Sequence, residues 1–321
     1  MNRILIDTDP GVDDALALLL ALKSPELHIE AITTVSGNVH VDQATQNLLR
    51  ILKLLELSEY PVVAKGETQP LVKPLVKAED VHGKDGLGNI SELQNTDGSP
   101  RYPFANCDIS TISGVDLIIE MVKRFPNELV IVALGPLTNI SVAIQKDPEC
   151  MRKLKSIIMM GGVFSEYGNI TTTAEFNVYV DPHAAHEVFI SGVPIQIVPL
   201  DVTHQVVLTG ERLMAETEGH DYKLTNFLIE STQACMEFYH ENVGFYGLHV
   251  HDALPIGILT HPHLFENVTA FVQVETEGNL TSGMTVADLR SDRVNTAPNA
   301  NICINVDSDK FLEHFFQRLL S

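Results

Sequence analysis

The feature that most constrains the fold is a run of acidic residues between an apolar strand and a helix, close to the amino terminus. Residues 4–6 are apolar, as in a buried strand, and the amphipathic stretch 13–23 is typical of a helix. Between them lies Asp7-Thr8-Asp9-Pro10-Gly11-Val12-Asp13-Asp14, with four carboxylates in eight positions. A strand that leads directly into a helix predicts an α/β sheet, and ligands bind at the carboxyl edge of such sheets.

Four negative charges this close together repel one another unless a cation or protons compensate them. Hard divalent cations prefer oxygen ligands, so calcium or magnesium is the expected bound ion. A purely structural role is the alternative: Asp9 would cap the helix, and Asp13 and Asp14 would compensate its dipole. This alternative accounts for the presence of two or three of the acidic residues, but not of all four. The sequence therefore favours a metal site at this turn.

The composition excludes several classes of partner. The chain has 321 residues and a formal net charge of −21, which repels phosphate backbones and anionic lipids. We therefore expect a small neutral or cationic substrate, with neither nucleic acid nor membrane as a partner. The four cysteines form no CxxC pair, no apolar run reaches transmembrane length, and the first strand begins at the start of the sequence. These features predict a cytoplasmic protein.

Strand-like and helix-like segments alternate along the chain, which predicts a mostly parallel central sheet flanked by helices, in an open Rossmann-like α/β fold. The predicted strands after the first are 29–35, 61–64, 129–134, 156–160 and 194–199, with a late pair at 269–274 and 302–306. The further predicted helices are 41–55, 111–125, 137–145, 183–190, 224–239, 253–259 and 310–320.

One long segment, 65–108, lacks this periodicity and is rich in glycine, proline and asparagine. A loop of this length inside a domain is either functional or a plain surface excursion, and both interpretations stay open. It contains the sequence VHGKDGLG at 81–88, whose glycines would let the backbone close over a ligand.

Polar residues also follow several of the other predicted strands, at the same edge of the sheet. Asn38 follows the second strand, the strand 129–134 leaves the carbonyl of Leu134 unpaired at the edge, and Glu175 and Asn177 lie beyond the strand 156–160. Near the other end of the chain, the run 249–252 reads HVHD and directly precedes an apolar helix. Its aspartate is either a helix cap or a carboxylate for a cation, and its histidines offer proton transfer.

Taken together, these motifs resemble the nucleoside hydrolase family, and they run in the family's order across nearly the whole chain. They are DTDPGVDDA at 7–15, TTVSGN at 33–38, VHGKDGLG at 81–88, GPLTN at 135–139, AEFN at 174–177 and HD at 251–252. The closest likeness is to bacterial ribonucleoside hydrolases of broad purine and pyrimidine range. The resemblance implies a single domain, 1–321, with an active-site loop at about 65–108 and a helical substrate-covering region at about 205–250.

The resemblance also implies an activity and a set of site residues. The family hydrolyses the N-glycosidic bond of ribonucleosides to ribose and free base, with bound calcium, and this activity serves nucleoside salvage. The implied calcium ligands are Asp9, Asp14, the main-chain carbonyl of Leu134 and Asp252. The implied catalytic groups are Asp9, the general base, and His251, the proton donor to the leaving base. The implied substrate-binding residues are Asp13, Asn38, His82, Glu175, Asn177 and Asp252, and the implied assembly is a homotetramer or homodimer.

The chemistry of the reaction agrees with these roles, because loss of the base leaves positive charge on the sugar, which carboxylates stabilise. The nucleobase specificity is less constrained. Tyr239, Phe245 and Tyr246 are candidates for stacking on the base or for ordinary packing. The chain has no tryptophan, which disfavours the tryptophan sandwich of purine-selective relatives. Broad or pyrimidine-preferring specificity is the expectation.

Two other functions remain compatible with parts of the sequence. The Asp-x-Asp pattern at 7–9 also resembles the haloacid dehalogenase-type phosphatases, with Asp7 as nucleophile and magnesium bound. That interpretation leaves AEFN and the late HD pair unexplained. A calcium-dependent nucleoside-binding protein without turnover would keep the site, but Asp9 and His251 would then have no purpose.

Overall fold

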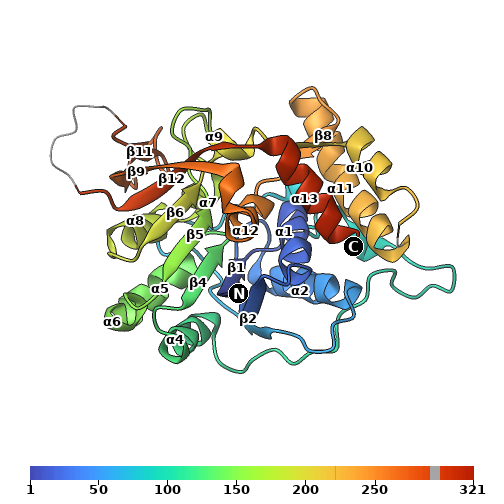
Figure 1. Ribbon diagram of the computed structural model, residues 1–321, viewed down its shortest axis with the longest axis horizontal. Coiled ribbons are helices and arrows are strands. Elements are labelled where there is room, and N and C mark those ends of the chain that lie inside the picture. Colours follow the sequence, from blue (N-terminus) through green and yellow to red (C-terminus); the bar gives the residue numbers. More distant parts are fainter. Residues whose placement is uncertain (221, 290–296) are drawn as a thin grey trace.

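The computed structural model describes residues 1–220, 222–289 and 297–321. A single eight-stranded sheet runs through it (Figure 1), and all neighbouring strands are parallel except the last pair, β12 and β9. Its strands, in spatial order, are β3 (Val62–Lys65), β2 (Leu27–Thr34), β1 (Asn2–Thr8), β4 (Leu129–Ala133), β5 (Ser156–Met160), β6 (Ile195–Val198), β12 (Ala300–Val306) and β9 (Phe265–Ala270). The predicted mostly parallel α/β sheet is confirmed.

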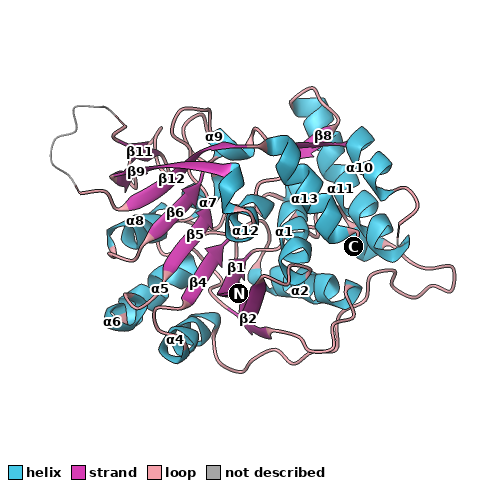
Figure 2. Ribbon diagram, viewed as in Figure 1, coloured by secondary structure: helices cyan, strands magenta, loops and turns pink. Residues whose placement is uncertain are grey.

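Helices cover both faces of the sheet, so its inner strands are buried on both sides (Figure 2). Along β1, Ile4 and Ile6 join the apolar cluster of one face and Leu5 joins that of the other, as the alternation of a strand requires. The first face carries α1 (Val12–Leu22), α2 (Val41–Leu54), α12 (Ala253–Thr260) and α13 (Ser308–Leu319). The second face carries α4 (Gly114–Arg124), α5 (Thr138–Lys146), α6 (Pro148–Met151) and α8 (Pro182–Ile190).

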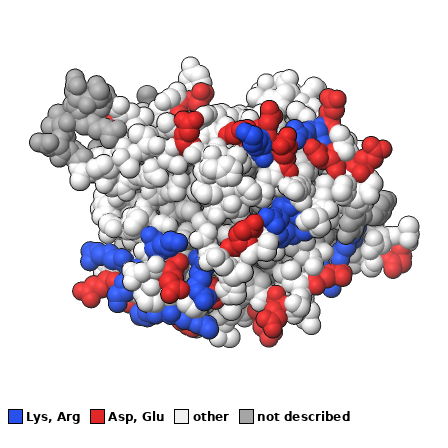
Figure 3. Space-filling model, viewed as in Figure 1, with Lys and Arg blue, Asp and Glu red and all other residues white. Residues whose placement is uncertain are grey.

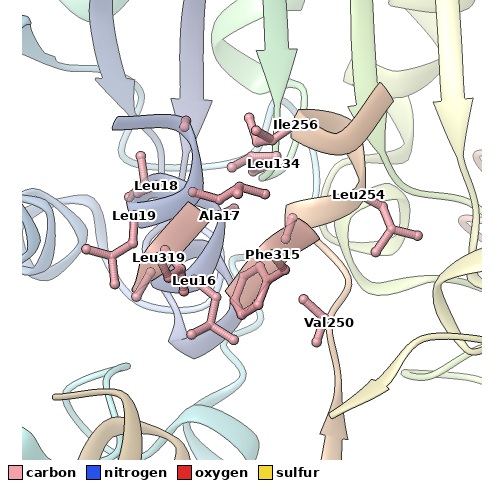
Figure 4. Close-up of a cluster of buried hydrophobic side chains, with 14 of the residues drawn as sticks. Leu16, Ala17, Leu18, Leu19, Leu134, Val250, Leu254, Ile256, Phe315 and Leu319 are labelled. Atoms are coloured by element: carbon pink, nitrogen blue, oxygen red, sulfur yellow. The ribbon is translucent and has the colours of Figure 1, made fainter. Parts of the chain in front are cut away.

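Helix α1 is buried from Val12 to Ala21, which explains why its sequence is apolar on almost every side. It contacts α2, α11, α12 and α13. In Figure 4 its residues Leu16 and Leu19 lie beside Phe315 and Leu319 of the carboxyl-terminal helix. The amino and carboxyl ends of the chain therefore pack together around the helix whose first turn carries the acids.

A second group of elements forms a helical lobe beyond the carboxyl edge of the sheet (Figure 1). It consists of α10 (Gly210–Thr217), α11 (Tyr222–Asn242) and the hairpin of β7 (Val207–Thr209) and β8 (Gly247–His249). Short helical turns complete this end of the molecule: α3 (Glu79–His82), η1 (Ile90–Glu92), α7 (Phe176–Val180) and α9 (Leu200–Thr203). The predicted helical region 205–250 coincides with this lobe, apart from residue 221, which lies outside the described residues.

The predicted strands and helices end within three residues of the observed ones, with one exception. The expected strand 269–274 is wrong, because the chain divides there between β9 and β10 (Val272–Val274), which pairs with β11 (Thr285–Ala287) in a separate sheet. The cause is the side chain of Asn299, which accepts a hydrogen bond from Val272 N (2.7 Å) and donates one to Val272 O (2.9 Å). These bonds take the place of a further pair with β12, and Val272 instead pairs with Ala287 of β11. The short turn η2 (Pro262–Leu264) precedes β9.

Charged side chains on the face shown in Figure 3 lie in small groups of mixed sign, separated by uncharged surface. Within the described ranges, no helix combines the length and the apolar character that a membrane span needs.

Candidate active site

The carboxylate of Asp7 lies at the end of β1 but is separate from the other acids. Its Oδ1 atom accepts hydrogen bonds from the hydroxyl of Thr33 and from Nδ2 of Asn139 (2.7 Å), which tie β1 to β2 and α5. The side chain is completely buried, and this burial raises the pKa of Asp7 to about 7. Its Oδ2 atom is buried without a partner among the described residues, but Asp7 neither lines the cavity described below nor belongs to the metal-ligand group, so its hydrogen bonds make it a structural link between elements.

Asp9 occupies a pocket that two glycines leave open. A Cβ atom at Gly37 would lie 2.0 Å from Oδ2 of Asp9, and one at Gly135 would lie 2.5 Å from Oδ1. The backbone N–H of Asn38 donates to Oδ2 (2.6 Å), whereas Oδ1 is buried and has no hydrogen-bond partner among the described residues. The turns after β2 and β4 thus enclose this carboxylate and leave one of its oxygens available.

Three further carboxylates converge beside it, from opposite ends of the chain. Ligand oxygens of Asp13, Asp14 and Asp252 all lie within 4.8 Å of one another, and all three side chains are buried. Asp14 accepts hydrogen bonds from the Thr8 hydroxyl, from Gly11 N (2.9 Å) and from the side chain of Asn38 (3.1 Å). Of the predicted metal ligands, Asp14 and Asp252 belong to this group, which contains Asp13 and not Asp9.

The electrostatics of this cluster favour a bound cation. Burial, and then the mutual repulsion of the acids, raises the pKa values of Asp9 and Asp252 well above the ordinary range. Burial is also the main cause that raises the pKa values of Asp13 and Asp14 to about 6. Oδ1 of Asp13, like Oδ1 of Asp9, is buried without a partner in the described part of the chain. Oxygen-only donors with unsatisfied lone pairs fit a hard divalent cation.

The carbonyl of Leu134 lies at the same edge, after β4. We expected it to be unpaired, and this is wrong, because Nδ2 of Asn177 donates a 2.8 Å hydrogen bond to it. A carbonyl oxygen has two lone pairs, so it keeps the capacity for one more partner. Leu134 and Asn177 both line the cavity described below.

Glu175 lies at the amino terminus of α7, where both its oxygens are used as a helix cap. Oε1 accepts from Asn177 N (2.8 Å), and Oε2 accepts from Gly162 N (3.0 Å) and Val178 N (3.1 Å). Burial raises the pKa of Glu175 to about 7. Its capping role, which the AEFN motif alone does not reveal, fixes the carboxylate at the cavity wall.

His251 lies next to Asp252 and has a partner at each ring nitrogen. Nδ1 is 2.7 Å from the hydroxyl of Thr203, and Nε2 is 3.4 Å from the hydroxyl of Tyr239. Burial, and then the neighbouring imidazoles of His249 and His204, hold the pKa of His251 well below its usual range. The imidazole of the free protein is therefore neutral at pH 7.

His82 reaches the acid cluster from the long loop. Its Nδ1 accepts a 3.1 Å hydrogen bond from Val12 N in the first turn of α1, and it lies 3.8 Å from Oδ1 of Asp13. Burial lowers the pKa of His82 to about 4. The loop is thus docked against the turn that carries the acids.

These groups surround a cavity of about 670 Å³. Of the predicted site residues, Asp13, Asn38, His82, Leu134, Glu175, Asn177, Tyr239, His251 and Asp252 line it. Asp9 and Asp14 are completely buried and do not line it. The structure therefore brings the predicted residues together in one region.

Of the three aromatic residues considered for stacking on the base, only one lines the cavity in the described part of the chain. Tyr239 lines the cavity, whereas Phe245 packs against Tyr239 and His249, with ring centroids 5.4 Å away in each case. Tyr246 packs near His240 and is 46% exposed, outside the cavity lining. Cys235 and Phe238 of α11 also line the cavity, as does Val243, which follows the helix.

Sequence reasoning also missed Thr203 and His204, which follow β6 at the same edge of the sheet. His204 stacks near His249, with 4.7 Å between ring centroids, and both line the cavity. Their position directly after a strand was the available signal, the same one that identified Asn38. The predicted strand ended at residue 199, and the residues beyond it were not considered as site residues.

Comparison with known proteins identifies the family. Residues 4–313 match the inosine-uridine preferring nucleoside hydrolase family. The chain belongs to the nucleoside hydrolases. It is 38% identical over 320 residues to the pyrimidine-specific ribonucleoside hydrolase RihA of Citrobacter koseri, which covers 98% of this chain and 97% of the relative. This match confirms the prediction that the chain is a ribonucleoside hydrolase, an enzyme that cleaves an N-glycosidic bond. It does not support the alternatives of a phosphatase or a non-catalytic binding protein.

Solved structures agree with this assignment. A plant nucleoside hydrolase superposes with a TM-score of 0.89 at 33% identity, covering 100% of this chain and 99% of the other. A purine-preferring ribonucleoside hydrolase from Gardnerella vaginalis gives a TM-score of 0.88 at 32% identity, covering 99% and 98%. Because similar nucleoside hydrolases include both pyrimidine-specific and purine-preferring enzymes, family membership does not decide the base.

Proposed function

We propose that this nucleoside hydrolase uses one calcium ion to release ribose from ribonucleosides for salvage. The observation that carries the proposal is the convergence of buried, partly unsatisfied carboxylates from residues 9–14 and 252 at one end of the cavity. Asp9, Asp14, Asp252 and the Leu134 carbonyl would hold the ion, since they offer only oxygen atoms. When bound, calcium polarises the attacking water and orients the sugar diol.

The residues of the chain then divide the remaining work. Asp9 accepts a proton from the attacking water at its unpartnered Oδ1. Asp13, Asn38, Glu175, Asn177 and Asp252, which line one part of the cavity, hold the ribose hydroxyls. Their carboxylate and amide oxygens oppose the positive charge that develops on the sugar as the base leaves.

His251 assists departure of the base. Its Nδ1 lies 2.7 Å from the Thr203 hydroxyl and its Nε2 lies 3.4 Å from the Tyr239 hydroxyl, so both ring nitrogens have a partner that orients the ring. In the proposed step His251 takes up a proton from solvent, donates it as imidazolium to the leaving base and returns to the neutral imidazole. His82 and Tyr239 flank the base on either side of this proton donor.

The specificity we propose is broad across purine and pyrimidine ribonucleosides, with pyrimidine preference as the alternative. The 38% identity to pyrimidine-specific RihA favours the alternative, whereas the purine-preferring relative shows that the fold also accepts purines. Comparison of kcat/KM for uridine, cytidine, inosine and adenosine decides between the two.

We further propose a single domain, 1–321, that assembles as a homotetramer or homodimer in the cytoplasm. Apolar clusters on both faces of one sheet support the single domain. In it, the loop at about 65–108 and the helical region at about 205–250 frame the cavity. One cooperative thermal transition and the mass from light scattering test these two statements.

A reducing-sugar assay tests the activity itself. Purified protein is incubated with uridine and with inosine, in calcium and after chelation. The proposal expects ribose release in calcium, its loss with chelator and its return when calcium is restored. Ribose release that chelator does not change would contradict the calcium requirement, and release from neither nucleoside would contradict the activity.

A further inference from the structure

Asn47 joins two parts of the active site without lining the cavity. It lies in α2, is completely buried, and its Nδ2 atom donates to Pro10 O (2.9 Å) and to Asp85 O (2.7 Å). Its Oδ1 atom accepts from Gln43 on the same helix (2.9 Å). Pro10 belongs to the turn of the acids, and Asp85 belongs to the loop of His82. One amide group therefore holds together two segments that are distant in sequence.

Asp85 in turn organises the loop that follows His82. Its carboxylate accepts three backbone hydrogen bonds of 2.8 Å, from Leu87 N, Asn89 N and Ser91 N. Leu87 is buried completely in the apolar cluster that α2 and α11 share. This part of the long loop is therefore a fixed wall of the site, although its sequence has no periodicity.

Two glycines allow the close approach of this wall. Gly86 has φ +82° and lies so near α2 that a Cβ atom would be 3.0 Å from Nδ2 of Asn47. Gly88 has φ +69°, and a Cβ atom there would lie 2.3 Å from the carbonyl of Ser231 on α11. The loop is thus held between two helices, with its contact to the acid turn made through Asn47 and His82.

We propose that Asn47 is a positioning residue, which fixes His82 and the acid turn relative to each other by its two donated hydrogen bonds. The amide is suited to this role because two buried carbonyls need two donors, and Nδ2 carries both. An aspartate of the same shape would place acceptors against both carbonyls, and an alanine would leave both unsatisfied. The inference rests on the proposed function in that His82 must contact the nucleobase.

Hydrogen–deuterium exchange of the metal-free protein tests the structural half without any turnover. Asn47→Ala is expected to raise the exchange rates of the Leu87, Asn89 and Ser91 amides by about tenfold or more, because opening of the loop becomes easier. The exchange rates of Asn47→Ser, which retains one donor, should lie between those of Asn47→Ala and those of the wild type. This second variant keeps the test possible if Asn47→Ala does not fold. Thr45→Ala is the matched control, since Thr45 is also buried on α2 but bonds only Val41 O and Thr34. Unchanged exchange in the Asn47 variants would overturn the inference.

A double-mutant cycle tests the catalytic half. Asn47→Ala is expected to lower kcat/KM for uridine about 10- to 100-fold, as small misplacements of site groups do. If Asn47 acts through His82, the double variant Asn47→Ala/His82→Ala should match His82→Ala within about twofold, and Thr45→Ala should match the wild type. Additive losses would overturn this half. A wild-type protein that releases no ribose would instead refute the proposed function, and the exchange result would still decide whether Asn47 holds the loop.

Discussion

The two ends of the cavity are built differently. At the acid end, Asp13 and Asp252 line the cavity and Asp9 and Asp14 are buried beside them; all four are at most 9% exposed, and Asp13 and Asp14 belong to the first turn of α1. At the other end, side chains of α11 and the segment after it line the cavity, and one of them, Val243, is 57% exposed. In the proposed function the bond-breaking groups therefore belong to the buried end, and the base is recognised at the more exposed end.

Under the proposed function, the two ends are expected to respond differently to substitution. A substitution in the acid turn disturbs buried charges and the core together, whereas one at a cavity-lining residue at or after the end of α11, such as Val243, alters a wall of the cavity. The similar proteins include a pyrimidine-specific and a purine-preferring enzyme. Mutations at the two ends should accordingly separate loss of turnover from change of specificity.

The largest effect is expected at the acid end. Asp9→Ala removes the proposed base and a proposed calcium ligand, so kcat for uridine should fall by about 10⁴-fold. All nucleosides should lose activity alike, because the defect lies at the sugar. Steady-state kinetics at saturating calcium measures this loss, with circular dichroism to show that the variant is folded. A variant that retains wild-type kcat would contradict the assignment of Asp9.

The next largest effect is expected at His251, between the two ends. His251→Ala should lower kcat for uridine by about 10³-fold, because the base leaves as a poor anion without a proton. Nitrophenyl riboside has a good leaving group, so kcat of the variant for this substrate should fall by about tenfold or less. Parallel assays of the two substrates give the comparison, and equal losses on both would remove the proton-donor role.

A smaller effect is expected at Thr203, which positions His251. Thr203→Val keeps the shape but deletes the hydroxyl at Nδ1, and kcat for uridine should fall by about tenfold because the imidazole loses its fixed orientation. Thr232→Val is the matched control, since its hydroxyl bonds only main-chain carbonyls of α11 (2.6 and 3.3 Å). A loss in the control as large as in Thr203→Val would show that the effect is general.

The smallest expected effect concerns the increase in Tm that calcium causes, which should depend on pH. Without metal the folded protein binds protons at Asp13 and Asp14, whose pKa values are about 6, and calcium must displace them. Calcium should therefore raise Tm more at pH 8 than at pH 5.5, by about 2–4 °C per kcal/mol of added binding free energy. Differential scanning fluorimetry with calcium or chelator at both pH values measures the difference. An equal or larger shift at the lower pH would contradict the account.

The acid end could be predicted from the sequence because its residues are close together in the chain or follow strands directly. Asp9 and Asn38 follow strands and Asp14 lies in the first turn of the helix after β1, so topology alone brings them to one edge. The base end depends on which face of α11 turns inward, and this is decided by packing of the lobe. The sequence therefore indicated the segments ahead of His251 but not which of their side chains enter the cavity: Cys235 and Val243 line it, whereas Phe245 packs beside Tyr239.

The long loop teaches the same lesson. Its order comes from the Asp85 carboxylate, the Asn47 amide and two glycines with positive φ, none of which creates a periodic pattern. The split of the late strand at Phe271 likewise depends on the side chain of Asn299, which approaches from a distant part of the chain. Long-range hydrogen bonds of single side chains are not visible to hydrophobic periodicity.

Calorimetric titration of metal-free protein with calcium tests the central claim most directly, because the account requires residues from both ends of the chain to hold one ion. Wild-type protein should bind one calcium per chain. Asp14→Asn and Asp252→Asn should each weaken binding by about 100-fold, although they lie 238 residues apart in the sequence. Calcium binding that neither substitution weakens, or no binding by the wild type, would contradict the account.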